Sequence, residues 1–513
     1  MSGRVHKSIL NAEVNLLFYF LSLFLTFFSR KIFLDCLGTE FVGLTGTLHN
    51  ILGYLNLAEF GIASCISVYL YKPLQSNNRQ SIQEILSVFG YLYRTIGTII
   101  LIGGIIVSFF FPLIFSKAQL GFGIIYFAFY SFLGSSLISY FINYRQILLS
   151  ADQKNYLVAI YLQSANLVKI ALQIFLAYHY KNLFFWVAIE FFFGIIGCII
   201  LNWKINQEYP WLKTNKKMGK GLLQKYPEIL KSTKQIFIHK IKDFLLSRSD
   251  ELFIFAFVSL KMVALYGNYT IIVTKISVLF NTVLNSVNAG VGNLVAEGEQ
   301  KKILSVFWEL MTIRHFIAGL LCFSIYFFTE PFISLWLGKD YILDHSILTL
   351  LVIYIYIANS RGVVDSYNHA YGLYGDIWAA WVELSINVTV TIIGGILWGI
   401  AGILLGKIIS VFSIIVFWKP YYLFCSGLHL PVSIYWNGTI RYYLILLVSF
   451  TIGAICLKFI PFSPFTNFIT WIGYCVIGLL CYLLCNVTLL WFYAKGSKES
   501  IKRFKLFKKW NSQ

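Results

Sequence analysis

Long apolar stretches without a single charged residue are the strongest constraint on how this chain folds. Residues 99–111, 442–457 and 465–494 contain no Asp, Glu, Lys or Arg. A helix needs roughly 20 apolar residues to cross a bilayer core about 30 Å thick. Charged residues make up only 12% of the chain, about half the usual share in a soluble protein. The sequence therefore predicts an all-α, polytopic membrane protein.

The hydropathy pattern predicts about fourteen membrane spans. The first apolar run follows Arg4 and Lys7 and has no small-residue cleavage site after it, so we expect an uncleaved span. The expected spans cover 11–34, 43–70, 89–113, 121–149, 156–178, 183–203, 236–259, 265–293, 303–328, 342–360, 376–397, 401–418, 440–459 and 466–494.

The net charge of +19 is concentrated beside the spans. Ten lysines lie within 204–242, and seven basic residues lie within 495–509. Clusters of this kind mark the cytoplasmic side of membrane proteins and contact anionic lipids. The pattern predicts a multi-pass protein of the bacterial cytoplasmic membrane with both termini in the cytoplasm. It does not indicate a nucleic-acid partner.

A short internal repeat indicates two related lobes. Ile85-Leu86-Ser87-Val88-Phe89 recurs as Ile303-Leu304-Ser305-Val306-Phe307, and Ser29-Arg30 matches Ser247-Arg248 at the same spacing. Chance matching in an apolar chain is the alternative. We expect an N-lobe over 1–205, a basic cytoplasmic loop over 206–235, a C-lobe over 236–420, two further spans over 421–494 and a basic tail over 495–513. Repeated transporters of this kind place the substrate between their halves.

Basic residues inside the predicted spans are the candidate substrate ligands. Charges at membrane depth are costly and usually face a bundle interior or a wet cavity. Arg30 and Arg248 occupy matching places in the two lobes and form a candidate clamp for a lipid-linked phosphate. Lys31, Lys169 and Lys275 are further candidates, with Lys407 a weaker one. Snorkelling to the interface or structural ion pairing is the alternative for each.

Two acidic residues in the spans are candidates for coupling transport to an ion gradient. Asp250 is the first and Glu251 the second, and both interrupt the predicted seventh span. Glu190 and Glu383 are further acidic residues within predicted spans. An intramembrane carboxylate binds a proton or a sodium ion. An acid beside an arginine can instead remain ionised and structural.

No catalytic, nucleotide-binding or metal-binding pattern stands out in the sequence. The stretch Gly402 to Lys407 is one residue short of a phosphate-binding loop and is followed by Ile408. The nine cysteines include no C-x-x-C pair. We therefore expect neither a cofactor nor a metal, and we expect the protein not to be an enzyme.

Several motifs resemble bacterial polysaccharide flippases. These are the O-antigen and capsule repeat-unit exporters of the multidrug/oligosaccharidyl-lipid/polysaccharide superfamily. The resemblance is carried mainly by Asn50 to Leu74 (NILGYLNLAEFGIASCISVYLYKPL), Leu265 to Tyr269, Pro331 to Gly338 and Ser385-Ile386-Asn387. It extends over about residues 8–430.

The resemblance implies two six-helix lobes around a cationic cavity and alternating access. It also implies an undecaprenyl-pyrophosphate-linked oligosaccharide as cargo, polysaccharide biosynthesis proteins as partners and a monomeric chain. It supplies no invariant site motif, so the site residues above depend on the membrane-charge argument alone. Relatives usually have a small polar residue where Lys407 stands.

Two other classes remain open. A cation-coupled drug antiporter of the same superfamily usually stops at twelve spans and uses acids in its first lobe. A polysaccharide polymerase or membrane glycosyltransferase usually carries a long external loop, whereas the longest polar loop here is the basic one after residue 204. A membrane scaffold without transport activity is a further alternative.

Overall fold

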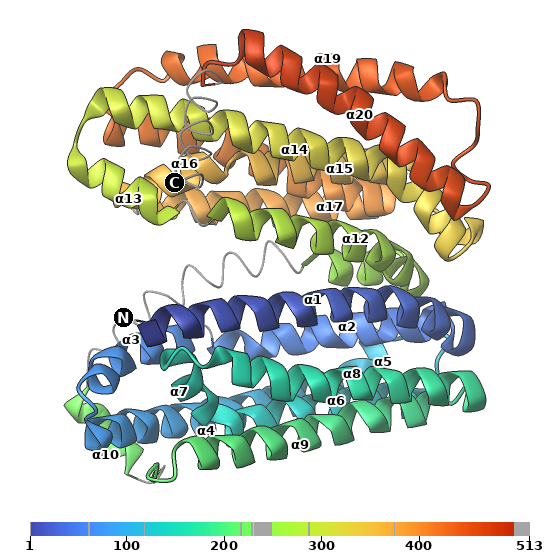
Figure 1. The fold of residues 1–513 in the computed structure, drawn as a ribbon. Coiled ribbons are helices and arrows are strands. Elements are labelled where there is room, and N and C mark those ends of the chain that lie inside the picture. Colours follow the sequence, from blue (N-terminus) through green and yellow to red (C-terminus); the bar gives the residue numbers. More distant parts are fainter. Residues whose placement is uncertain are drawn as a thin grey trace. The chain divides into compact units, whose positions relative to one another are not determined.

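The computed structural model is helical throughout its described residues, which are 2–59, 62–116, 118–215, 218–226, 229, 249–285, 288–373 and 375–496. This confirms the predicted all-α class. The chain forms two compact units, Met1–Ala264 and Leu265–Gln513 (Figure 1). The division lies within α12 (Leu260–Asn285), whereas the sequence placed the C-lobe from residue 236. The predicted lobe boundaries stay a prediction, because residues 230–248 are not among those described.

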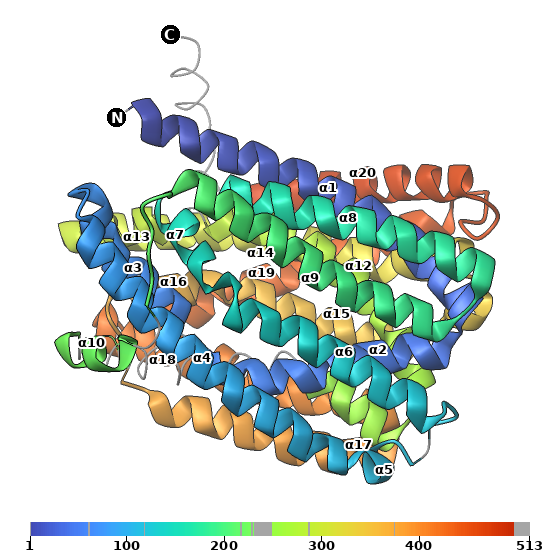
Figure 2. The same cartoon turned by 90° about the horizontal axis from the view of Figure 1, so that it is seen from below.

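The first unit is a bundle of long helices joined by short ones. Its helices are α1 (Ser2–Leu37), α2 (Thr39–Leu55), η1 (Asn56–Glu59), α3 (Ile62–Gln75), α4 (Arg79–Phe109), α5 (Phe111–Ile114), α6 (Phe122–Phe141), η2 (Asn143–Arg145), α7 (Gln146–Ala151), α8 (Asn155–Tyr180), α9 (Leu183–Glu208) and α10 (Gly219–Lys225). Helix α8 packs on α1 and α9, and α6 packs on α4 and α9 (Figure 2).

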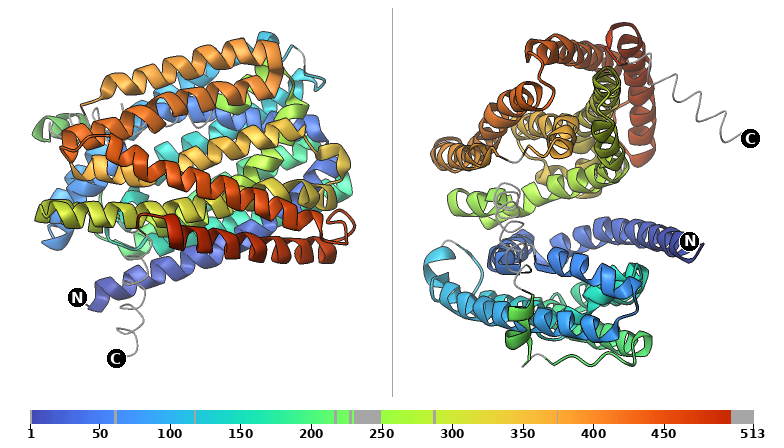
Figure 3. Two further views of the ribbon diagram at one scale, coloured as in Figure 1. Left: turned by 90° about the horizontal axis from the view of Figure 1, so that it is seen from above. Right: turned by 90° about the vertical axis from the view of Figure 1, so that its left-hand side faces the viewer.

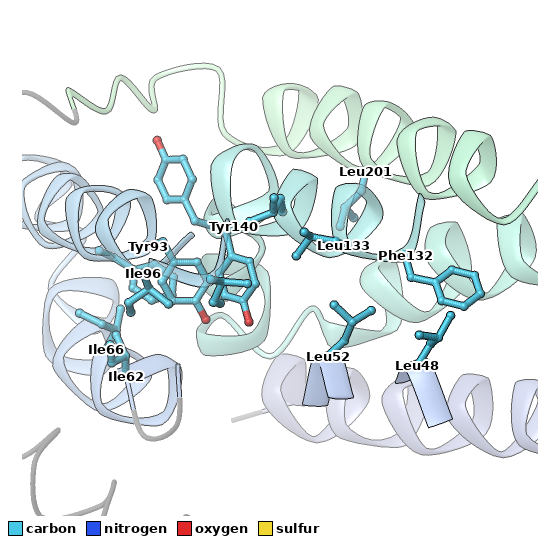
Figure 4. Packing of buried hydrophobic residues seen from close by; sticks show 14 of the residues in the cluster. Leu48, Leu52, Ile62, Ile66, Tyr93, Ile96, Phe132, Leu133, Tyr140 and Leu201 are labelled. Carbon is cyan, nitrogen blue, oxygen red and sulfur yellow. The ribbon is translucent and has the colours of Figure 1, made fainter. Parts of the chain in front are cut away.

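Aliphatic and aromatic side chains fill the core of this unit. Leu48 and Leu52 of α2 are buried with Phe132 and Leu133 of α6 (Figure 4). Burying such side chains is worth about 1.5–3 kcal/mol each. The first copy of the repeated pentapeptide lies in α4, where Phe89 is 1% exposed and packs against Tyr93 at 4.1 Å between ring centroids.

The basic loop after α9 is partly folded onto the first unit. Glu84 of α4 accepts hydrogen bonds from Lys225 Nζ at 2.7 Å and from Tyr226 Oη at 2.9 Å. A side chain at Gly219 would overlap the backbone of Ser87, so glycine permits α10 to lie directly on α4. The described part of the loop is thus a component of this unit.

The second unit contains two long helical layers and the C-terminal pair. Its helices after α12 are α13 (Asn288–Glu297), α14 (Gln300–Trp336), η3 (Lys339–Tyr341), α15 (His345–Ser360), α16 (Gly362–Ala370), α17 (Ile377–Val411), η4 (Phe412–Trp418), α18 (Lys419–Tyr422), η5 (Leu423–Gly427), α19 (Ser433–Lys458) and α20 (Phe468–Tyr493). Helices α19 and α20 lie side by side, and both pack on α14 (Figure 3). The second pentapeptide lies in α14, with Phe307 fully buried. The two-lobe repeat itself stays a prediction.

Helix α17 is a tight hairpin that turns at Gly399. That residue has φ 57° and ψ −130°, a backbone conformation that favours glycine. The two limbs pack through small residues, because a Cβ at Gly402 would overlap the backbone of Gly394 and one at Gly406 would overlap Thr391. The turn falls between the predicted spans 376–397 and 401–418, and small residues permit the close approach of the two limbs.

Ten stretches in the described part of the chain are long and apolar enough to cross a membrane. One of them, Ile377–Gly427, contains the turn at Gly399 and so includes two predicted spans. Large apolar side chains point outward, such as Ile469, which is 82% exposed, and Phe24, which is 71% exposed. Exposed apolar surface on this scale indicates contact with lipid. The total of about fourteen spans stays a prediction.

The predicted second span, 43–70, is instead two helices with a break between them. Helix α2 ends at Leu55, η1 covers Asn56–Glu59, and α3 begins at Ile62. A hydropathy pattern does not reveal this break, because the groups that stabilise it come from other helices. Ser136 of α6 donates to Asn56 Oδ1 at 3.3 Å, and Tyr93 and Tyr140 donate to the Glu59 carboxylate.

Candidate functional site

Arg30 is held against the start of α12 within the first unit. It lies in the last two turns of α1 and is partly buried. Its Nη2 donates a hydrogen bond of 2.9 Å to the backbone carbonyl of Ala264, a residue that is 1% exposed. Lys31 is exposed, because the next position on a helix points about 100° around the axis. Of these two predicted ligands, Arg30 contacts α12, the helix that follows a cluster of polar residues in the chain.

That cluster joins α2 to the acidic residues of the predicted seventh span. Asn50 Nδ2 donates to Glu251 Oε2 at 2.5 Å. Asp250 is 8% exposed and interacts electrostatically with Tyr54. We call Asn50, Tyr54, Asp250 and Glu251 the polar cluster. The sequence selected Asp250 and Glu251 as candidates. It missed Asn50 and Tyr54, which carry no charge and so gave no signal in an apolar stretch.

Glycines on α2 bring the backbones around the polar cluster together. A Cβ at Gly43 would overlap the carbonyl of Leu260, and one at Gly46 would lie 3.5 Å from Glu251 Oε2. Ser259 Oγ accepts from the backbone N–H of Met262 at 3.2 Å and so caps the start of α12. The carboxylate of Glu251 therefore lies beside Gly46 of α2, a position that has no side chain.

Arg248, the second half of the predicted clamp, lies outside the described residues. Lys275 is on α12 in the second unit and is partly buried. The roles of both as phosphate ligands stay predictions.

Lys169 forms an ion pair within the first unit. Its Nζ lies 2.7 Å from Glu190 Oε1, joining α8 to α9. Gln173, which is 1% exposed, donates to Glu190 Oε2 at 3.0 Å. This arrangement matches the structural alternative that the sequence left open for Lys169. Its role as a substrate ligand stays a prediction.

Two more predicted intramembrane charges are buried in the hairpin α17. Glu383 is 2% exposed and Lys407 is 6% exposed. The Lys407 ammonium lies 4.5 Å from the ring centroid of Tyr354 on α15, within the range of a cation–π interaction. Nearby, Asn387 Nδ2 donates to Ser410 Oγ at 3.4 Å across the two limbs.

Glu59 is a partly buried carboxylate that sequence reasoning did not select. Tyr93 of α4 and Tyr140 of α6 each donate to one of its oxygens, the latter bond being 2.5 Å. Figure 4 shows the two tyrosines among Ile62, Ile66 and Ile96. A signal was present in the sequence, because Glu59 is an acid within an apolar stretch, and the same criterion selected Asp250 and Glu251.

The comparisons with known proteins find structural similarity only. No family model matches the chain, and no curated protein matches it in sequence. A solved structure of the lipid II flippase MurJ in an inward closed conformation matches with a TM-score of 0.66 and 18% identity, over 94% of this chain and 99% of that one. An inward-facing multidrug resistance MATE family transporter of the MOP superfamily matches with a TM-score of 0.58 and 14% identity, over 82% of this chain and 98% of that one.

The chain has the fold of these membrane proteins. Both matches cover nearly the whole of the solved chain, so the similarity is not confined to one helical bundle. At this level of identity the likeness establishes the fold and leaves the cargo open. The specific resemblance to O-antigen flippases therefore belongs to the proposal below.

Proposed function

We propose that this protein is a flippase that moves a lipid-linked oligosaccharide across the bacterial cytoplasmic membrane for surface polysaccharide synthesis. The observation that carries the proposal is the partly buried Arg30, held by the backbone carbonyl of Ala264, in a chain with the fold of a lipid flippase. Both termini are proposed to lie in the cytoplasm.

The pyrophosphate of such a cargo loses its hydration on leaving the headgroup layer. A guanidinium replaces part of that hydration, because its planar N–H groups form paired, charge-assisted bonds to phosphate oxygens. The hydrogen bond to the backbone carbonyl oxygen of Ala264 directs the Arg30 side chain and limits its rotamers. Arg30 is therefore proposed as a ligand of the lipid phosphate, with Arg248, Lys31, Lys169 and Lys275 as further proposed ligands.

Transport against a gradient also needs an energy source. Asp250 and Glu251 are proposed to bind the coupling ion, a proton or sodium ion. Their place supports this role, since Asp250 is buried and Glu251 contacts a different helix through Asn50. Binding of an ion changes a charge at a contact between two segments, which is the requirement for coupling to a conformational change.

A cation-coupled drug antiporter is the second candidate, and the fold match to a multidrug transporter supports it. That match covers 82% of this chain, and the match to the lipid flippase covers 94%. Both matches concern the fold, so transport measurements decide between the two candidates.

Deletion and reconstitution separate the two candidates. In a deletion strain we expect lipid-linked repeat units to accumulate on the cytoplasmic leaflet and the surface glycan to be lost. Purified protein in liposomes should translocate the lipid-linked oligosaccharide extracted from that strain. Normal surface glycan in the deletion strain, together with ion-driven efflux of cationic dyes by the liposomes, would overturn the flippase assignment in favour of the antiporter.

A further inference from the structure

The contact between Asn50 and Glu251 joins two segments that are far apart in the sequence. Asn50 is on α2 and is 5% exposed, and its Nδ2 lies 2.5 Å from Glu251 Oε2. The Asn50 end of the bond is therefore buried, and the bond is charge-assisted when Glu251 is ionised. Such bonds are roughly twice as strong as those between neutral groups.

We propose that Asn50 is the positioning residue that transmits ion binding at Glu251 to helix α2. This inference depends on the proposed function, since it assigns a role within ion-coupled transport. An ionised Glu251 holds α2 through the Asn50 N–H group. A proton or sodium ion on the carboxylate removes its negative charge or occupies its lone pairs, and the bond to α2 weakens.

The packing around this bond allows α2 to shift when the bond is lost. Gly43 lies against the backbone of Leu260, and Gly46 lies beside the side chains of Glu251 and Val263. Interlocking side chains resist sliding, and these two positions of α2 contribute none. The polar contacts of Asn50 and Tyr54 therefore help to fix the register of α2 against this segment.

Three other charged or titratable residues belong to the same compact unit as the bond between Asn50 and Glu251. Asp250 is adjacent on the same segment, Tyr54 of α2 interacts with Asp250, and Arg30 of α1 binds Ala264 farther along. Asp250 and Glu251 are adjacent in the sequence, so an ion bound at one changes the electrostatic field at the other.

The test compares Asn50→Asp and Asn50→Leu in the full-length protein, reconstituted with lipid-linked oligosaccharide, across a pH series with and without sodium. Asn50→Asp adds a carboxylate beside Glu251, and we expect the pH profile of transport to move upward by about one unit or more. Asn50→Leu removes the donor, and we expect transport to persist with a flattened dependence on pH and sodium. The matched control is Asn78→Asp at the exposed N-cap of α4, where Asp caps as well as Asn, and its profile should equal the wild type.

Unchanged profiles in both Asn50 variants, or an equal loss of transport at every pH, would overturn the inference. Absence of oligosaccharide transport by the wild-type protein would instead overturn the proposed function. A measurement that needs no Asn50 variant is hydrogen exchange at constant pH. Glu251→Gln mimics the neutral state, so amide exchange in residues 249–258 should be at least several-fold faster than in the wild type. Equal exchange would contradict the proposed role of the bond.

Discussion

The guanidinium of Arg30 on α1 donates a 2.9 Å hydrogen bond to the backbone carbonyl of Ala264 on α12. These residues are more than two hundred positions apart, yet both belong to the first compact unit. A buried carbonyl that accepts from a cation fixes the direction of the side chain and compensates part of its charge. The contact therefore positions Arg30 in addition to stabilising the fold.

Replacement of Arg30 should abolish transport while leaving a folded protein. We expect Arg30→Ala to lower transport at least tenfold, because it removes the planar donor group, and Arg30→Lys to restore only part of it. Arg248→Ala should have the same effect if the two residues act as a clamp. Reconstituted transport and thermal unfolding in detergent provide the measurements, with the exposed Lys181→Ala as control. Wild-type transport by Arg30→Ala would refute the ligand role.

Lys169 and Glu190 should behave as a structural pair. Breaking a partly buried ion pair leaves one uncompensated charge, so Glu190→Gln or Lys169→Met alone should cost about 1–3 kcal/mol of stability. The side chains are 16% and 20% exposed, which limits the effect. The double variant should be more stable than either single variant in thermal unfolding. Additive losses would show that the pair is not coupled, and lost transport in a stable double variant would favour the substrate role.

The tyrosines that bind Glu59 should stabilise the break after α2. Tyr93→Phe and Tyr140→Phe each remove a hydrogen bond to the partly buried carboxylate of Glu59. Each should cost about 1–3 kcal/mol of stability. Tyr178→Phe is the matched control, because Tyr178 is 66% exposed on α8. Unfolding temperatures that stay at the control value for both variants would contradict the importance of this contact.

The hairpin α17 should not tolerate a methyl group at its closest approach. Gly402→Ala should destabilise the protein by more than about 3 kcal/mol, since the new Cβ overlaps backbone atoms that cannot rotate away. Gly123→Ala in α6 is the control, because a Cβ there meets no atom within 4 Å. Comparable expression and unfolding temperatures for the two variants would mean that the limbs are not packed as described.

The candidate site was predictable only where it contains charges. Asp250, Glu251 and Arg30 are conspicuous because ionised groups are costly in apolar segments. Asn50 is an uncharged residue whose partner lies 201 positions away, so no local pattern identifies it. The break that places Glu59 was also hidden, since its compensating groups come from α4 and α6.

The sequence by itself determined the helical class and the hairpin at Gly399, because hydropathy and glycine spacing act through lipid solvation and local backbone sterics. Tertiary structure alone decided that Asn50 contacts Glu251, that Lys169 is paired with Glu190 and that Arg30 is directed to Ala264. Those outcomes depend on which helix faces meet, and in an apolar chain many helix faces are similarly hydrophobic. Hydrogen bonds and close glycine contacts, formed only after packing, select among them.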